Sequence, residues 1–300
     1  MPDQPLPSAA PGDPVGLGAL VDAKGDSIVS VCLPARNEAD TVGKIVEIVR
    51  RELVDGAGLV DELLVVDDHS TDGTDDVASA AGATVVQAEA VLPEYGEGHG
   101  KGEALWKSLF VARGDLVVWC DADISNFGAG FVVELLRPLL TDPSIAFVKG
   151  YYERPEVGWT GGGRVTELVA RPTLSLLFPD LGDIVQPLAG EYAGRRSVLE
   201  HLPFVEGYGV EIGLLIDVAN RVGVDAIAQV DLGTRIHRNR PLDELSPQAL
   251  AVLATALRRA GMLDAVGEVA LRRPDGGAVS VDLGERPPLV HVPAYRRRSA

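Results

Sequence analysis

Short apolar runs alternate with helical stretches along the first half of this 300-residue chain. The apolar runs are rich in β-branched residues and occupy 27–33, 63–66, 84–88 and 117–120. Stretches with the composition and spacing of helices follow them and end near residues 53, 81, 113 and 140. A short apolar run bounded by polar turns is typical of a strand that is buried in a parallel sheet. The alternation therefore predicts an α/β protein with a Rossmann-like, mostly parallel sheet and helices on both of its faces.

The fourth apolar run leads directly into two acids, in the segment VVWCDAD at 117–123. Asp121 and Asp123 then lie at the carboxyl end of a strand, where open α/β sheets bind their ligands. Side chains alternate along a strand, so we expect both carboxylates to point to the same side. Two hard oxygen donors suit a magnesium-like ion that carries a phosphate. The motif is weak by itself, and a strand followed by an acidic turn is the alternative.

The charge balance excludes some classes of partner. The chain has 27 Lys and Arg against 44 Asp and Glu, a net charge of -17. This balance argues against a general binder of nucleic acid or of anionic membranes. Any anionic ligand must therefore be held by a local cluster of positive groups or by a cation.

The two cysteines and the hydropathy pattern predict the compartment. Cys32 and Cys120 both lie inside apolar runs, as expected for buried thiols in a reducing environment. We find no run of about 20 apolar residues and no signal-peptide pattern at the N-terminus. The expectation is a cytoplasmic protein without a membrane segment.

Two further segments suit anions. Three glycines precede a helical run in TGGGRVTEL at 160–168, which would expose backbone N–H groups at a helix N-terminus beside Arg164 and Thr166. A flexible linker is the alternative.

Arg235, His237, Arg238 and Arg240 then form the densest basic patch of this acidic chain. We interpret it as an anion or metal site, with a solvated charge run as the alternative.

A glycine-rich loop at 96–102, GEGHGKG, is not a known phosphate loop. The Walker A pattern requires Gly where Tyr95 stands and Ser or Thr where Gly102 stands. The Rossmann spacing does not fit either, which disfavours a nicotinamide-dependent dehydrogenase.

Polar motifs follow the strands in a fixed order: P-x-x-N-E at 34–38, D-D-x-S-x-D-G-T at 67–74, G-K-G at 100–102 and D-x-D at 121–123. Glu38 could accept hydrogen bonds from ribose hydroxyls, Asp68 could bind a base edge or ribose, and Lys101 could reach a phosphate. The ordered set is far more specific than any one motif and points to a nucleotide.

Longer segments carry a family resemblance over residues 27–245: GKGEALWKSL, GGGRVTELVARP, QPLAGEYAGRR, GYGVEIGLLID and AIAQVDLGTRIHRNRPL. They resemble the glucosyl-3-phosphoglycerate synthases, retaining GT-A-fold glycosyltransferases of family 81. The resemblance implies a hexosyltransferase that moves glucose from UDP-glucose to the 2-hydroxyl of 3-phosphoglycerate. The product would be a precursor of glucosylglycerate or of methylglucose lipopolysaccharide. It also implies Mg²⁺, with Mn²⁺ or Co²⁺ as substitutes, and a homodimer.

The resemblance also implies roles for individual residues. Those implied for the donor are Pro34, Ala35, Asn37, Glu38, Asp68, Lys101, Asp121 and Tyr208. Those implied for the acceptor are Gly163, Arg164, Val165, Thr166 and Asn239. Asp123 and His237 would hold the metal. The reacting centre would comprise Asp123, Leu188 through its backbone carbonyl near the anomeric carbon, Glu211 and Arg235.

The same resemblance suggests a division of the chain. We expect a disordered tail over 1–25, a nucleotide-sugar-binding half over 26–150, an acceptor-binding half over 151–245, and a C-terminal helix and extension over 246–300 that could form a dimer contact. No acid stands out as a nucleophile, and we expect Glu211 to bind sugar hydroxyls. The expected mechanism is a same-face displacement in which the departing phosphate helps to deprotonate the acceptor.

Two alternatives remain open. A mannosyl-3-phosphoglycerate synthase that uses GDP-mannose could share the fold and the acceptor site. A non-catalytic nucleotide-sugar-binding protein should have lost the D-x-D motif or the metal histidine, and this sequence keeps both.

Overall fold

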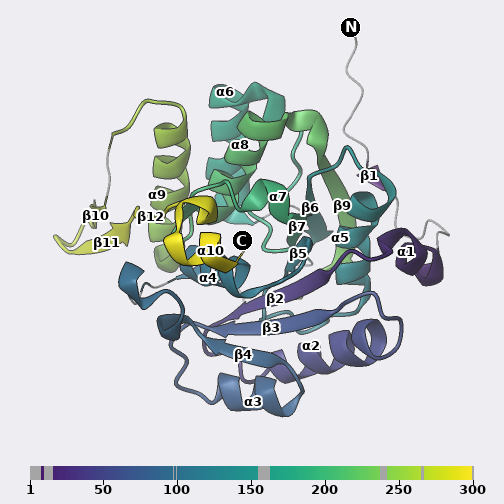
Figure 1. Ribbon diagram of the computed structural model, residues 1–300. Helices are drawn as coiled ribbons and strands as arrows, with labels where there is room; N and C mark the ends of the chain where they lie inside the picture. The colour runs from purple at the N-terminus through teal and green to yellow at the C-terminus, as the bar shows by residue number, and fades with distance from the viewer. Residues whose placement is uncertain are drawn as a thin grey trace, which may run out of the picture.

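A central sheet organises the molecule (Figure 1). The computed structural model describes residues 8–9, 16–96, 98, 100–154, 163–236, 242–264 and 267–298. Within these ranges the sheet has eight strands in the order β1-β9-β6-β7-β5-β2-β3-β4. The strands are β1 (Ser8–Ala9), β2 (Val29–Ala35), β3 (Glu62–Asp67), β4 (Thr84–Gln87), β5 (Leu116–Trp119), β6 (Phe147–Glu153), β7 (Tyr192–Arg195) and β9 (Ile227–Thr234). Strand β7 runs antiparallel to both neighbours and every other pairing is parallel. The prediction of a mostly parallel sheet is confirmed.

Helices cover both faces of the sheet, as predicted (Figure 1). They are α1 (Leu17–Lys24), α2 (Val42–Val49), α3 (Thr74–Ala80), α4 (Lys101–Val111), α5 (Gly130–Thr141), α6 (Arg171–Leu177), α7 (Arg196–Leu199), α8 (Val210–Val222), α9 (Leu242–Arg259) and α10 (Pro293–Arg298). The alternation of side chains along each strand divides the core in two. In β5, Val118 packs into the core that α1, α2 and α5 cover, while Val117 and Trp119 pack into the core beneath α4 and α8.

The register of the parallel strands brings their polar turns to one edge of the sheet. Ala35 at the end of β2 pairs with Asp67 at the end of β3. Cys32 of β2 pairs with Trp119, the last residue of β5. The loops that follow these three strands therefore leave the sheet side by side, as expected for an α/β ligand site.

The N-terminal segment corrects one expectation. A tail was predicted to extend through residue 25, but helix α1 occupies most of residues 16–25. Its apolar residues Leu17, Leu20 and Val21 follow the spacing of a helix face. Leu20 is fully buried in the core beside α2 and α5. The prediction of a tail is therefore wrong for this part of the segment.

The C-terminal segment packs back onto the same subunit. Strands β10 (Glu268–Arg272) and β11 (Ala278–Asp282) form a hairpin. Strand β12 (Glu285–Arg286) then pairs antiparallel with β8 (Phe204–Val205). The indole N–H of Trp106 in α4 donates to the carbonyl of Pro287 at 2.8 Å. This segment is thus part of the core, and its expected role in a dimer stays a prediction.

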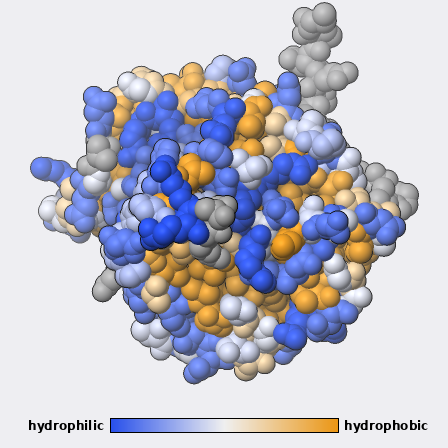
Figure 2. All heavy atoms as spheres, in the orientation of Figure 1, coloured by the Kyte–Doolittle hydropathy of each residue, from blue (hydrophilic) through white to orange (hydrophobic). Residues whose placement is uncertain are grey.

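Other expectations can also be checked. Cys32 and Cys120 are free and fully buried, as predicted. The helix predicted to reach residue 53 changes into a π-helix over Arg50–Val54. None of the described helices is both long enough and apolar enough to cross a membrane. Hydrophilic and hydrophobic residues are interspersed on the face shown in Figure 2.

Candidate active site

The loops after β2, β3 and β5 enclose a cavity of about 360 Å³ together with the start of α4. This volume lies within the range of small-molecule sites. The lining residues are Pro34, Ala35, Arg36, Glu38, Asp68, Gly100, Lys101, Ala104, Asp121, Ala122, Asp123, Gly207 and Tyr208. The structure therefore brings together all but one of the residues expected at the donor. It adds Arg36, whose side chain is 56% exposed and supplies a cation at the rim.

Asn37 is the expected donor residue that does not line the cavity. It adopts a left-handed conformation with φ of 58°. Its amide carbonyl oxygen accepts a hydrogen bond from the Thr71 N–H at 2.9 Å, and its own N–H donates to the Ser70 hydroxyl at 2.9 Å. Asn37 thus joins two neighbouring βα loops and shapes the cavity indirectly.

A buried arginine binds both acids of the D-x-D motif. Arg235 follows β9 and is 3% exposed. Its Nη2 donates to Asp121 Oδ2 at 2.9 Å and to Asp123 Oδ1 at 2.6 Å. Its Nη1 donates to the hydroxyl of Tyr152 at 2.8 Å and lies 2.9 Å from Glu191 Oε1. The charge of Arg235 is therefore balanced by carboxylates, which its place in a basic patch did not predict.

The sequence predicted that both acids lie at the carboxyl end of a strand, but the structure places them beyond it. Strand β5 ends at Trp119, so Asp121 and Asp123 both belong to the turn that follows. They nevertheless approach the same guanidinium nitrogen. The position of Asp121 depends on a close backbone approach, because a Cβ on Gly190 would lie 2.2 Å from its Oδ2.

Lys101 links the acid pair to helix α8. Its Nζ lies 2.5 Å from Asp121 Oδ1 and 2.8 Å from Glu211 Oε1. Burial favours the neutral form of Asp121, but the charges of Lys101 and Arg235 hold the pKa of this carboxyl well below its usual range. Asp121 is therefore ionised and held by two cations, whereas within the described part of the chain Asp123 forms an ion pair with Arg235 alone.

The donor set suits a hard divalent cation. The side chain of Asp123 is 34% exposed, compared with 21% for Asp121, and both line the cavity. Four carboxylates (Asp121, Asp123, Glu191, Glu211) lie around two cations (Lys101, Arg235), so the cluster is net negative. Carboxylate oxygen and a net negative charge fit Mg²⁺ or Mn²⁺. In the described part of the chain no three metal-ligating side chains converge. His237 lies outside it.

The residues expected at the acceptor are only partly described, and none of the four that the structure describes lines the cavity. Arg164 and Val165 form the first helical turn, and Thr166 is buried at the start of a π-helix. Gly163 lies against Arg154, since a Cβ at this glycine would be 2.9 Å from Arg154 Nη1. Asn239 lies outside the described residues.

Tyr152 connects this segment to the acid pair. Its hydroxyl oxygen accepts hydrogen bonds from Arg154 at 2.9 Å and from Arg235 at 2.8 Å. A continuous set of contacts therefore runs from Gly163 through Arg154, Tyr152 and Arg235 to Asp123.

The segment around Leu188 contains two site residues, Gly190 and Glu191, that the sequence did not predict. Leu188 is partly buried, Gly190 touches Asp121, and Glu191 is a fully buried partner of Arg235. Burial raises the pKa of Glu191, although Arg235 lowers it in part. Lys149 of β6 donates to the carbonyl of Ala189 at 2.6 Å. A lone lysine inside the apolar run 145–151 was the available signal for this contact.

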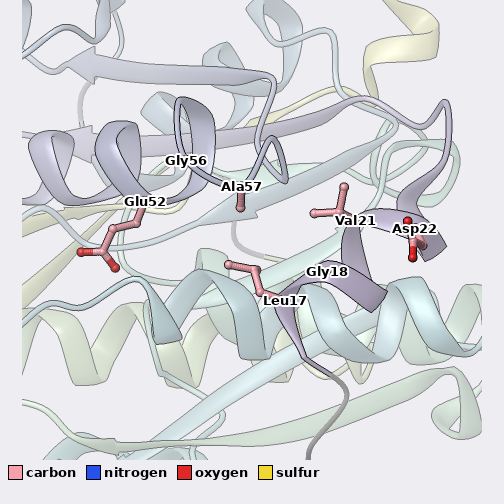
Figure 3. Close-up of a pocket in the computed structure, with 7 residues that line it drawn as sticks. All are labelled: Leu17, Gly18, Val21, Asp22, Glu52, Gly56 and Ala57. Atoms are coloured by element: carbon pink, nitrogen blue, oxygen red, sulfur yellow. The ribbon is translucent and has the colours of Figure 1, made fainter.

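A second hollow lies apart from these residues, between α1 and the end of the second helix (Figure 3). Its lining is Leu17, Gly18, Val21, Asp22, Glu52, Gly56 and Ala57. It has two carboxylates and no cation, so it is poorly suited to an anionic ligand.

Comparisons with known proteins agree with this geometry. The family model described as glycosyl transferase family 2 matches residues 30–202. The glucosyl-3-phosphoglycerate synthase of Mycolicibacterium paratuberculosis is 50% identical over 90% of this chain and 86% of its own length. The synthase of Petrotoga mobilis is 46% identical over 92% and 90%. A crystal structure of the Mycobacterium tuberculosis synthase with Mn²⁺, UDP-glucose and phosphoglyceric acid has a TM-score of 0.88 at 47% identity and covers 96% of this chain and 99% of that one.

Proposed function

Because the chain belongs to glycosyl transferase family 2 and, within it, to the glucosyl-3-phosphoglycerate synthases, we propose that it transfers glucose from UDP-glucose to 3-phosphoglycerate. The product is glucosyl-3-phosphoglycerate. We propose further that the acceptor atom is the 2-hydroxyl oxygen and that the anomeric configuration is retained. The observation that carries the proposal is the single cavity that gathers the expected donor residues beside the D-x-D acids.

The cavity offers a suitable group for each part of the donor. Glu38 and Asp68 supply oxygen acceptors in the lining. The backbone N–H of Gly100 donates to Asp68 Oδ2 at 2.9 Å, which fixes this carboxylate for a base or ribose. Lys101, Asp121 and Asp123 line the same cavity and would lie near the diphosphate. Tyr208 lines the same space and is 43% exposed, so it can pack against the glucose.

A divalent cation completes the site in this proposal. Asp123 and His237 would hold it, and Mg²⁺ is the proposed ion, with Mn²⁺ or Co²⁺ as substitutes. When bound, such an ion stabilises the negative charge that develops on the leaving UDP. Asp121, which Lys101 and Arg235 already hold, would support the neighbouring ribose and orient the turn.

The acceptor is trianionic and requires positive groups outside the donor cavity. We assign Gly163, Arg164, Val165, Thr166 and Asn239 to it. The contacts from Gly163 through Arg154 and Tyr152 to Arg235 support this assignment, because they couple that segment to the reacting centre. We also assign residues 26–150 to the donor and 151–245 to the acceptor, and we expect a homodimer.

Retention is proposed to occur by a same-face displacement. A two-carboxylate mechanism needs a free acid beside the anomeric carbon. Glu211 is the nearest candidate, but it is 6% exposed and its Oε1 lies 2.8 Å from Lys101 Nζ. This pairing favours a role in holding sugar hydroxyls. Isolation of a glucosyl adduct on Glu211 would overturn the same-face mechanism.

The decisive experiment offers two donors to one acceptor. The protein is incubated with 3-phosphoglycerate and either UDP-glucose or GDP-mannose, with and without Mg²⁺, and the products are identified by NMR. We expect turnover with UDP-glucose and Mg²⁺ and an α-configured product that retains the donor's anomeric configuration. Preferred turnover of GDP-mannose would identify a mannosyltransferase. Nucleotide binding without turnover of either donor would identify a non-catalytic binding protein.

A further inference from the structure

Lys149 is a lysine in the middle of the sheet. It lies in β6, where it pairs with Tyr192 of β7 on one side and with Gln229 of β9 on the other. It is 1% exposed. Lysine is almost never fully buried without a partner, because its charge is costly to remove from water. Its position therefore calls for a specific contact that offsets this cost.

The contact is a backbone carbonyl. Lys149 Nζ donates to the oxygen of Ala189 at 2.6 Å and lies 4.3 Å from the centroid of the Tyr192 ring. Among the described residues, no carboxylate lies within ion-pair distance of this amine. Charged groups on the surrounding elements are Glu211 on α8, Lys101 on α4, Glu191 beside β7 and Asp121 after β5. An amine donates a hydrogen bond in both its protonated and its neutral form, so the contact does not depend on its charge.

The carbonyl belongs to a segment that strand β6 holds at several points. The Gln186 side chain donates to the carbonyl of Tyr152 at 2.5 Å, and the Gly150 N–H donates to the carbonyl of Glu191 at 2.9 Å. Between these two ends, Lys149 provides a side-chain contact at Ala189. The carbonyl of Ala189, the residue after Leu188, is thus held in place by Lys149.

One neighbour of Ala189 contacts the site, and the other is expected at the reacting centre. Gly190 packs directly beneath the Asp121 carboxylate. Leu188 is the residue whose backbone carbonyl is expected near the anomeric carbon. A shift of the Ala189 peptide would move both groups, and misplacement by about 1 Å can cost about 100-fold in rate.

We propose that Lys149 is a positioning residue for glucosyl transfer, which holds residues 188–190 so that the Leu188 carbonyl and Asp121 keep their places beside the donor glucose. The proposal rests on the proposed function. It predicts that loss of the amine slows the chemical step more than it weakens nucleotide binding, because Glu38 and Asp68 lie on other loops and only the contact of Asp121 with the ribose would shift.

The test compares Lys149→Met, which removes the donor, with Lys149→Gln, which has the same side-chain length as Met and retains an N–H donor. We expect kcat to fall at least about 10-fold in Lys149→Met, with KM for UDP-glucose and the calorimetric Kd for UDP within about 3-fold of wild type. Lys149→Gln should recover part of the lost kcat. Lys24→Met, on α1 and away from the cavity, is the matched control and should behave as wild type.

Two outcomes would overturn the inference. One is a Lys149→Met variant with wild-type kcat. The other is a loss of kcat that is matched by loss of UDP affinity and is not relieved in Lys149→Gln, which would indicate a general structural role. If the wild-type protein itself turns over neither donor, the proposed function fails, and this result is distinct from a failure at Lys149 alone.

Discussion

Arg235 and Asp123 lie 112 positions apart in the chain, yet Nη2 of one and Oδ1 of the other are 2.6 Å apart. The acid that is expected to bind the metal therefore already has a buried cationic partner. A metal ion at Asp123 must share this carboxylate with Arg235, and its affinity depends on both groups.

Replacement of Asp123 by Ala should abolish metal-dependent turnover without unfolding the protein. Arg235 keeps Asp121 and Glu191 as partners in this variant, so no buried charge is left alone. We expect a loss of at least about 100-fold in kcat, as when other groups that stabilise developing charge are removed. Initial rates across a Mg²⁺ titration and thermal melts measure the two effects. His237→Ala should behave in the same way, and wild-type rates in either variant would show that the metal site is misplaced.

Gly190→Ala should impair activity through steric contact with Asp121. The new Cβ would lie 2.2 Å from Asp121 Oδ2, so the carboxylate or the backbone must move. We expect kcat to fall about 10-fold or more, since displacements near 1 Å have effects of that size. Gly128→Ala is the matched control, because a Cβ there meets nothing within 4 Å. Equal rates for the two variants would contradict the proposed importance of this contact.

Arg286→Met should destabilise the fold from the C-terminal segment. The Arg286 guanidinium pairs with the fully buried Glu103 of α4 and donates to the carbonyl of Tyr95 at 2.7 Å. Glu103 keeps the buried Lys107 as a partner at 2.9 Å in this variant, so we expect a loss of about 1.5–3 kcal/mol in the free energy of unfolding, as for lost hydrogen bonds to a charged group. Arg113→Met, whose side chain is 68% exposed beside Glu62, should cost about 0–1 kcal/mol. Urea unfolding at pH 7 measures both free energies, and similar values would refute the assigned role of Arg286.

Lys149 should make stability depend on pH. Burial, the largest cause, lowers the pKa of its amine from 10.5 to about 7, a net value that includes the opposing effect of Glu211 and the smaller lowering by the charge of Lys101. Between these values the unfolded chain binds the proton and the folded protein does not. The free energy of unfolding therefore rises with pH above about 7.

The comparison with Lys149→Met isolates this effect. Between pH 6.5 and 8.5 the stability of the wild type relative to the variant should increase by about 2 kcal/mol. Burial raises the pKa of the Cys32 thiol from 9.0 to about 12, so the free energy of unfolding falls with pH above about 9 through this group. The measurements therefore stop below pH 9. Urea unfolding at several pH values measures this difference in the free energy of unfolding. A difference that stays constant across the window would show that the amine has an ordinary pKa and would contradict the prediction.

The sequence predicted the sheet because its strands have a local signature. Apolar runs such as 63–66 and 117–120 are continuous, and their order predicts parallel pairing. The reversed direction of β7 could not be predicted, since it depends on which neighbours Tyr192–Arg195 meets in space. Helix α1 was missed because the glycines and prolines around it outweighed the spacing of Leu17, Leu20 and Val21.

The site was predicted well where a motif carries it and poorly where burial decides. Lys101, Asp121 and Asp123 meet in one cavity, as their motifs suggested. Arg235 was assigned to a basic patch, but its charge is balanced by three acids from two distant segments, the turn after β5 and the residue before β7. Glu191 and Tyr152 went unnoticed because nothing in their local sequence shows that they are the partners of a buried guanidinium.

The contact between Arg286 and Glu103 also has a consequence for synthesis of the chain. The two residues are 183 positions apart, and Glu103 is made long before its partner. Domains generally fold from the N-terminus as they are made, and distant contacts form late. The start of α4 lines the donor cavity, so the cavity should mature only when the last segment has been translated, although all of its lining residues precede residue 209. A chain that stops before β12 would contain every residue that lines the cavity and still lack the ion pair between Arg286 and Glu103.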